Sequence, residues 1–172
     1  EGTYGPLTNG EKMPILVPSY FSINGTSSGE VILDAEGLSG VMKIDSEAAT
    51  KISNLTITGG NDEYGGGISC EGSITLQNAI ITGNLAHHGA GIDFGGWGIS
   101  SADAVLQNVL IYDNKATDRG GGIYCSSSQL LLQNVTLADN EGARGGGVYC
   151  QHGTHITMQN SILSNNTGEI YF

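Results

Sequence analysis

Two of the six lysines and arginines of this sequence stand next to its glycine clusters. Arg119 and Arg144 each come directly before three consecutive glycines, and His88 holds the same place before a third cluster. A column of such groups could bind acidic sugars, because guanidinium groups pair well with carboxylates. The alternative is that both arginines are solvated residues at chain corners that pair with Asp118 and Glu141.

Aromatic side chains follow the same clusters. Tyr124 and Tyr149 occupy equivalent positions, Tyr171 continues them, and Asp93 takes their place one unit earlier. Aromatic rings on a flat surface can stack against sugar rings. The sequence favours tyrosines that only cover an exposed sheet, and a glycan-binding surface is the candidate function set against that interpretation. The residues of this candidate surface are Tyr124, Tyr149, Trp97, Asp93, His88, Arg119 and Arg144.

The acidic residues give a second candidate site. Asp113 and Asp139 fall at equivalent positions of neighbouring units. Two like charges at close range favour a bound cation, and oxygen ligands suit calcium. Calcium is the one cofactor that the sequence suggests, and the alternative is that both carboxylates face water. His87 and His88 are interpreted as turn residues, with metal binding as the alternative.

No catalytic residue is predicted. Polysaccharide lyases need clustered carboxylates and a basic side chain, and glycosidases need aspartates grouped on one face. The chain has only six lysines and arginines, and its "HHGAG" segment has no N-x-D or D-D partner at useful spacing. The sequence favours a protein without enzymatic activity, and a carbohydrate-active enzyme is the alternative.

The three cysteines allow at most one disulfide between neighbouring units. Cys125 and Cys150 lie one unit apart, whereas Phe94 takes this position between Cys70 and Cys125. In-register side chains point in parallel, which strains a disulfide. Buried free thiols are therefore favoured.

Composition narrows the set of partners. Seventeen acidic residues against six basic ones give a net charge of −11, so nucleic acid would be repelled. The 28 glycines with only three prolines indicate frequent tight turns. No apolar run approaches the ~18 residues of a membrane-spanning helix. No membrane-spanning segment is predicted.

The positions compared above belong to an internal repeat. Two columns of asparagines recur at intervals of 24 to 30 residues, and both fall in turns. Amides stacked in register can hydrogen-bond along the stack, so the columns predict asparagine ladders, with Asn54 and Asn134 facing inward. The first column consists of Asn54, Asn78, Asn108, Asn134 and Asn160, and the second of Asn84, Asn114, Asn140 and Asn166.

Between the turns, apolar residues alternate with polar or outward-facing ones. Leu130 and Leu132 are expected to point inward with Leu131 outward. Three such strands fit each unit, and one unit cannot enclose a core alone. Coiling the units predicts an all-β solenoid with three parallel sheets, three strands per coil and six to seven coils. The glycine clusters mark a sharp corner at the entry to each third strand.

The units resemble those of right-handed, single-stranded parallel β-helix proteins of the pectin-lyase-like superfamily, in particular polymorphic outer-membrane-protein and autotransporter-type passenger repeats. Those repeats pair a G-G-A-I motif with an F-x-x-N motif. Residues 121–123, "GGI", and residues 137–140, "LADN", are examples here. The resemblance covers residues 51–172 closely and residues 1–50 loosely. It implies a fold that lyases, hydrolases, adhesins and inert scaffolds share.

The whole chain, 1–172, is predicted to form one β-helix domain, with irregular coils over 1–50 and regular repeats over 51–172. Neither end is expected to carry an amphipathic helix or a polar capping segment. An uncapped stack exposes strand edges. We therefore expect either a part of a longer protein or a unit that polymerises end to end with other copies.

The sequence favours a non-catalytic structural or adhesive module that is secreted or exposed on the surface of a bacterial or archaeal cell. The acidic composition, the scarcity of lysine and the resemblance favour this location. The alternative is a carbohydrate-binding or carbohydrate-active β-helix that uses the outer face of the sheet formed by the third strands.

Overall fold

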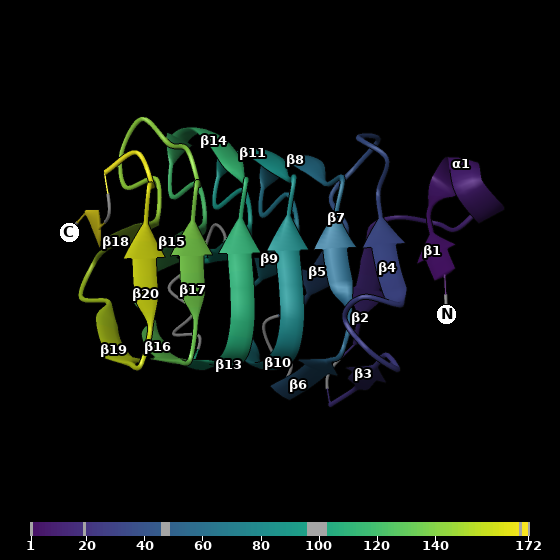
Figure 1. Cartoon of the computed structure of the whole chain (residues 1–172), viewed down its shortest axis with the longest axis horizontal. Helices are drawn as coiled ribbons and strands as arrows, with labels where there is room; N and C mark the ends of the chain where they lie inside the picture. Colours follow the sequence, from purple (N-terminus) through teal and green to yellow (C-terminus); the bar gives the residue numbers. More distant parts are fainter. Residues whose placement is uncertain (1, 19, 46–48, 96–102, 169, 172) are drawn as a thin grey trace.

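Parallel strands stacked along one axis build the molecule. The structure is a computed structural model, and it describes residues 2–18, 20–45, 49–95, 103–168 and 170–171. Figure 1 shows the coils side by side along the long axis, with the N-terminus at one end and the C-terminus at the other. The predicted all-β solenoid is confirmed, with three sheets and about six coils.

Three sheets, called A, B and C here, run along this axis. Sheet A contains β1 (Gly2–Tyr4), β3 (Ser22–Asn24), β4 (Val31–Asp34), β6 (Ala49–Ser53), β7 (Thr56–Thr58), β10 (Ser73–Thr82), β13 (Asp103–Tyr112), β16 (Gln129–Gln133), β17 (Thr136–Ala138), β19 (His155–Gln159) and β20 (Ile162–Ser164). Sheet B contains β2 (Ile15–Val17), β5 (Met42–Ile44), β9 (Ile68–Cys70), β12 (Ile92–Phe94), β15 (Ile123–Ser126), β18 (Val148–Gln151) and β21 (Ile170–Tyr171). Sheet C contains β8 (Asn61–Tyr64), β11 (Leu85–His88) and β14 (Lys115–Arg119).

The boundaries of the strands within a coil differ from the sequence prediction. The first and second predicted strands join into single long strands in β10 and β13, which bend at Asn78 and Asn108. Both asparagines are left-handed, with φ of 51° and 54°. Asparagine tolerates this conformation, so the chain turns without losing its pairing. Sheet B corresponds to the predicted third strands, and sheet C forms where the sequence indicated only turns.

Side chains of the same type stack inside the solenoid. Leu130 and Leu132 are buried and Leu131 is half-buried, as the alternation predicted. One interior column joins five successive strands of sheet A through residues that pair in register. Its members are Ile52, Leu76, Leu106, Leu132 and Met158.

The glycine clusters turn the chain into sheet B. Gly120 is left-handed, with φ of 62°. A Cβ atom on Gly122 would lie 2.6 Å from the carbonyl oxygen of Gly147 in the next coil. The first glycine therefore supplies the corner, and the third allows two backbones to approach closely.

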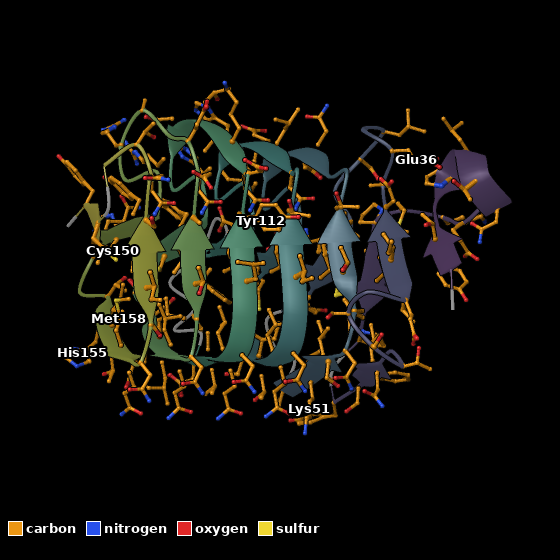
Figure 2. All side chains as sticks on the ribbon, viewed as in Figure 1. Glu36, Lys51, Tyr112, Cys150, His155 and Met158 are labelled. Atoms are coloured by element: carbon orange, nitrogen blue, oxygen red, sulfur yellow. The ribbon has the colours of Figure 1, made fainter. Side chains whose placement is uncertain are left out.

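A short helix lies at the N-terminal end of the described chain. Helix α1 (Pro6–Asn9) has no buried residue, and Glu36 lies beside it (Figure 2). The Glu36 carboxylate accepts hydrogen bonds from the Thr8 backbone N–H, at 2.9 Å, and from the Thr8 hydroxyl. Across the described ranges, no helix is long and apolar enough to cross a membrane.

Candidate functional site

The second asparagine column is a buried ladder. Asn84, Asn114 and Asn140 are 0 % exposed, and each donates from Nδ2 to Oδ1 of the next asparagine at 2.9 to 3.0 Å. Each also donates to a backbone carbonyl of the preceding coil, as Asn114 does to Ile81, and Asn114 donates in addition to Tyr112 of its own coil. The ladder ends at Asn166 and confirms the prediction for this column.

The first asparagine column faces outward, so the prediction that Asn54 and Asn134 point inward is wrong. The backbone of each is left-handed, which directs its side chain away from the core; Asn134 is exposed and Asn54 half-buried. Successive amides still hydrogen-bond, at 3.1 Å between Asn134 and Asn108. The outer ladder runs through Asn24, Asn54, Asn78, Asn108 and Asn134, with Asn160 in the same place one coil further.

A second ladder of amides that the sequence analysis missed accompanies the outer asparagines. Gln107 donates to Gln133 at 2.6 Å, and Gln133 donates to Gln159 at 2.8 Å. Figure 2 shows polar side chains in a row along the edge of the solenoid that carries Lys51. The signal was present in the sequence, because a glutamine precedes each of the last four asparagines of this column.

The predicted basic column is present at the junction of sheets B and C. His88 pairs with Tyr64 on one side and Arg119 on the other, and Arg119 pairs with Arg144. Asp118 lies 2.6 Å from Arg144 and 3.3 Å from Arg119. Both arginines therefore share one carboxylate, and the expected pairing with Glu141 is wrong, since Glu141 binds Lys115 at 2.6 Å.

Charge and burial shift two pKa values in this column. Burial and the adjacent His87 lower the pKa of His88, which leaves its imidazole neutral at neutral pH. For Asp118, burial acts to raise the pKa, whereas the hydrogen bond from Arg144 and the positive charge of that residue act to lower it. The lowering effects together are the larger, so the pKa of Asp118 lies below its usual range. Asp118 is therefore ionised.

The tyrosines form the predicted column on the outer face of sheet B. The rings of Tyr124 and Tyr149 stack with centroids 5.7 Å apart, and those of Tyr149 and Tyr171 with centroids 5.0 Å apart. The Arg119 guanidinium lies 5.3 Å from the centroid of the Tyr149 ring. Tyr124 is only 7 % exposed. Tyr171 lies at the end of the column, where no further ring covers it among the described residues, and is 46 % exposed.

The Asp93 side chain is buried, whereas the sequence predicted it on an accessible surface. Its backbone is in register with Tyr124, but its side chain is 1 % exposed, and neither carboxylate oxygen has a hydrogen-bond partner among the residues that the structure describes. Burial, with a smaller contribution from Glu71, raises the pKa of this carboxyl to about 8. Asp93 therefore carries a proton at neutral pH and cannot contact a glycan from the surface in this conformation.

The remaining predicted groups are two aspartates, one tryptophan and the cysteines. Asp113 and Asp139 are exposed and left-handed in successive coils, and the calcium site between them stays a prediction. Trp97 lies outside the described residues. Cys125 and Cys150 pair in register and are free thiols, and burial raises the pKa of Cys70 to about 12.

A comparison with the profiles of known protein families identifies the family of this chain. The profile of the right-handed beta helix region matches residues 23–171. The chain belongs to this right-handed β-helix family. No curated protein and no solved structure matches the chain.

The outer face of sheet B in this β-helix is hollowed near its N-terminal coils. A hollow of about 450 Å³ lies between Leu16, Lys43 and Glu71 and is completed by Val17, Pro18 and Asp45. Lys43 pairs with Ser69, which pairs with Asp93, so this hollow continues the row of the tyrosines. The sequence analysis missed Lys43 because the repeats over residues 1–50 are too irregular to align.

Gln151 is a second residue of this face that the sequence analysis missed. Its side-chain oxygen accepts a hydrogen bond from Arg119 at 3.4 Å, and its side-chain nitrogen donates to the Tyr124 hydroxyl. Gln151 thus connects the basic column to the tyrosine column. Its signal was its place two residues after Tyr149, on the same face of the strand.

Proposed function

We propose that this β-helix is a non-catalytic structural and adhesive module that acts outside the cell. The tyrosine column carries the proposal, because three rings stack at nearly regular spacing on a face that the arginines and Gln151 border. The coils hold these groups rigid through three ladders of amides, two of asparagines and one of glutamines. A surface that is rigid before contact binds with a smaller loss of conformational entropy.

Glycans are the ligand class that this face fits best. Tyr171 offers the most exposed ring, and the Arg144 side chain is 42 % exposed beside it. Sugar rings can stack on tyrosine, and guanidinium groups can bind hydroxyl or carboxylate groups of the sugar.

Binding of the purified chain to immobilised glycans tests the adhesive role. Tyr171→Ala and Arg144→Gln should each reduce binding at least about tenfold, because they remove a stacking face or a charged donor. Tyr112→Ala is the matched control, since Tyr112 lies on sheet A, and it should bind as the parent does. Equal losses in all three variants, or no glycan bound by the parent chain, would contradict adhesion through this face.

The extracellular location rests on the acidic composition, the scarcity of lysine and the resemblance to passenger repeats. We expect an antibody against the chain to label intact cells of the bacterium or archaeon that encodes it. Labelling that requires lysis of the cells would contradict this part of the proposal.

A carbohydrate-active enzyme is the second candidate; it requires a change of conformation at sheet B that exposes the Asp93 carboxyl, which is 1 % exposed here. A carboxyl whose pKa is about 8 could act as a proton donor at neutral pH. Incubation with acidic and neutral polysaccharides should then release unsaturated or reducing ends, and Asp93→Asn should abolish the release. No turnover of any polysaccharide would remove this candidate.

End-to-end contact between coils is a further part of the proposal. Ile162 on β20 is 59 % exposed, whereas the equivalent Leu110 is half-buried between two coils, so a coil stacked beyond Ile162 would cover part of this side chain. Such a coil can come from the same polypeptide or from another copy. Sedimentation of the chain at tens of micromolar, with and without Ile162→Asp, distinguishes the two, because only association between copies depends on concentration.

A further inference from the structure

A β-bulge at the edge of sheet C turns an acidic side chain toward two histidines. Ala86 pairs with Ala116 and His88 pairs with Arg119, so β14 contains one residue more than β11 in this interval. A bulge of this kind redirects a side chain relative to the regular alternation. Here Asp118 is brought to His88, with Oδ2 4.0 Å from Nδ1.

The two histidines converge on the same point although they are adjacent in the chain. Their ring centroids are 4.4 Å apart at an angle of 48°. One ligand atom from each of His87, His88 and Asp118 lies within 4.8 Å of the others, and across the described ranges these three form the only such group of histidine, cysteine or acidic residues. Nδ1 of His88 is buried and has no hydrogen-bond partner within the described part of the chain.

We propose that His87, His88 and Asp118 bind a divalent transition-metal ion such as zinc. Two imidazole nitrogens and one carboxylate oxygen are a ligand set that suits zinc, and the fourth position is open to water or to an external ligand. Tetrahedral zinc ligands lie about 3.4 Å apart, so His88 and Asp118, whose ligand atoms lie 4.0 Å apart, must close by about 0.6 Å. The ligand atoms of all three residues lie within 4.8 Å, so the pairs with His87 must close by at most about 1.4 Å through rotation of the side chains.

Neighbouring residues already orient two of the three ligands. Nδ1 of His87 lies 2.8 Å from the Thr117 hydroxyl oxygen, which leaves Nε2 of the same ring for the metal. Nε and Nη2 of Arg144 donate to Oδ1 of Asp118 at 3.1 and 2.6 Å, which leaves Oδ2 toward His88. Such outer partners fix the orientation of metal ligands.

Arg119 is the group that opposes a cation here. Its Nε lies 3.3 Å from Oδ2 of Asp118 but makes no hydrogen bond. The far end of the guanidinium is held by the Tyr149 ring and by Gln151. Arg119 can therefore yield Oδ2 to a metal ion and keep its other contacts, while the net charge of −11 favours cations around the molecule.

Calorimetric titration of the full chain with zinc chloride at about pH 7.5 tests the site, where an ordinary histidine is mostly neutral. We expect one ion per chain, and visible absorption typical of tetrahedral coordination when Co²⁺ replaces zinc. His88→Gln and His87→Asn should each weaken zinc binding at least about tenfold. His155→Ala is the matched control, because His155 is exposed on β19, and it should bind as the parent does.

The thermal unfolding temperature supplies a second measurement on the same proteins. Zinc should raise it for the parent chain and for His155→Ala, and should leave it unchanged for His88→Gln. The proposal is overturned if the parent binds no zinc up to about 1 mM. It is also overturned if His155→Ala loses as much affinity as His88→Gln, because the ion then binds surface histidines without a specific site.

Discussion

Removing one rung of the buried asparagine ladder should destabilise the β-helix far more than removing one rung of the outer ladder. Asn114 is 0 % exposed and takes part in five side-chain hydrogen bonds, with Asn84, Asn140, Ile81 and Tyr112. Asn114→Ala deletes all five. The backbone N–H of Asn84 then has no acceptor in the described structure.

The magnitude follows from these partners. A buried donor left without an acceptor costs about 1–3 kcal/mol, and each further lost hydrogen bond costs about 0.5–1.5 kcal/mol, without full additivity. We expect the free energy of unfolding to fall by about 4 kcal/mol. Asn108→Ala removes only exposed hydrogen bonds and places alanine at a φ of 54°, which costs about 1–2 kcal/mol. Asn108→Gly should be close to neutral, because glycine accepts this backbone conformation.

Urea denaturation followed by far-ultraviolet circular dichroism measures the difference. With a slope of about 2 kcal/mol per molar urea, the midpoint of Asn114→Ala should fall by about 2 M and that of Asn108→Ala by less than about 1 M. Equal shifts for the two variants would refute the reasoning. They would mean that water replaces the lost amide inside the solenoid, or that the two columns are equally exposed in solution.

Three further predictions concern glycine packing, Asp93 and Cys70. Gly122→Ala should lower the urea midpoint strongly, by about 2–3 kcal/mol in unfolding free energy, whereas Gly29→Ala, with no atom within 4 Å of the added Cβ, should not lower it. The pKa of Asp93 is raised to about 8 in the folded chain, so stability should decline as pH rises from about 4 to 8. Asp93→Asn should remove this decline, giving a higher midpoint than the parent at about pH 9 and a similar one at about pH 4. Cys70 should resist iodoacetamide at about pH 8 until urea unfolds the chain, because burial raises its pKa to about 12; mass spectrometry of the labelled peptide measures this.

The repeat made the solenoid and its register predictable from sequence. Cys125 and Cys150, or Tyr124 and Tyr149, recur at a fixed spacing, and stacking like residues over like requires in-register coils. Whether the side chain of a turn residue points into the core or outward was not predictable in the same way. Asn108 and Asn114 both recur with the same period, but φ of 54° at Asn108 sends its side chain outward. Periodicity reports equivalence between coils and does not report the backbone conformation within a turn.

The candidate site was predictable only in part for a related reason. The column of Tyr64, His88 and Arg119 follows from counting back from the glycine clusters. The bulge in β14 does not, because one additional residue before a corner can be absorbed in several ways. This bulge is what places Asp118 beside His88. Likewise, the burial of Asp93 depends on what packs over it, which alternation of apolar and polar residues does not describe.

The orientation of the strands also determines how the molecule bears force. Strands such as β10, β13 and β16 lie across the long axis, so the hydrogen bonds between coils run along it (Figure 1). Tension applied to the two ends would load only the bonds of one terminal coil at a time. Each coil of 26 residues, the spacing from Asn108 to Asn134, would release about 90 Å of extended chain before the next coil bears the load. Under a pull along its axis, the β-helix would therefore lengthen in successive steps, each set by the length of the coil released, and dissipate energy at each one.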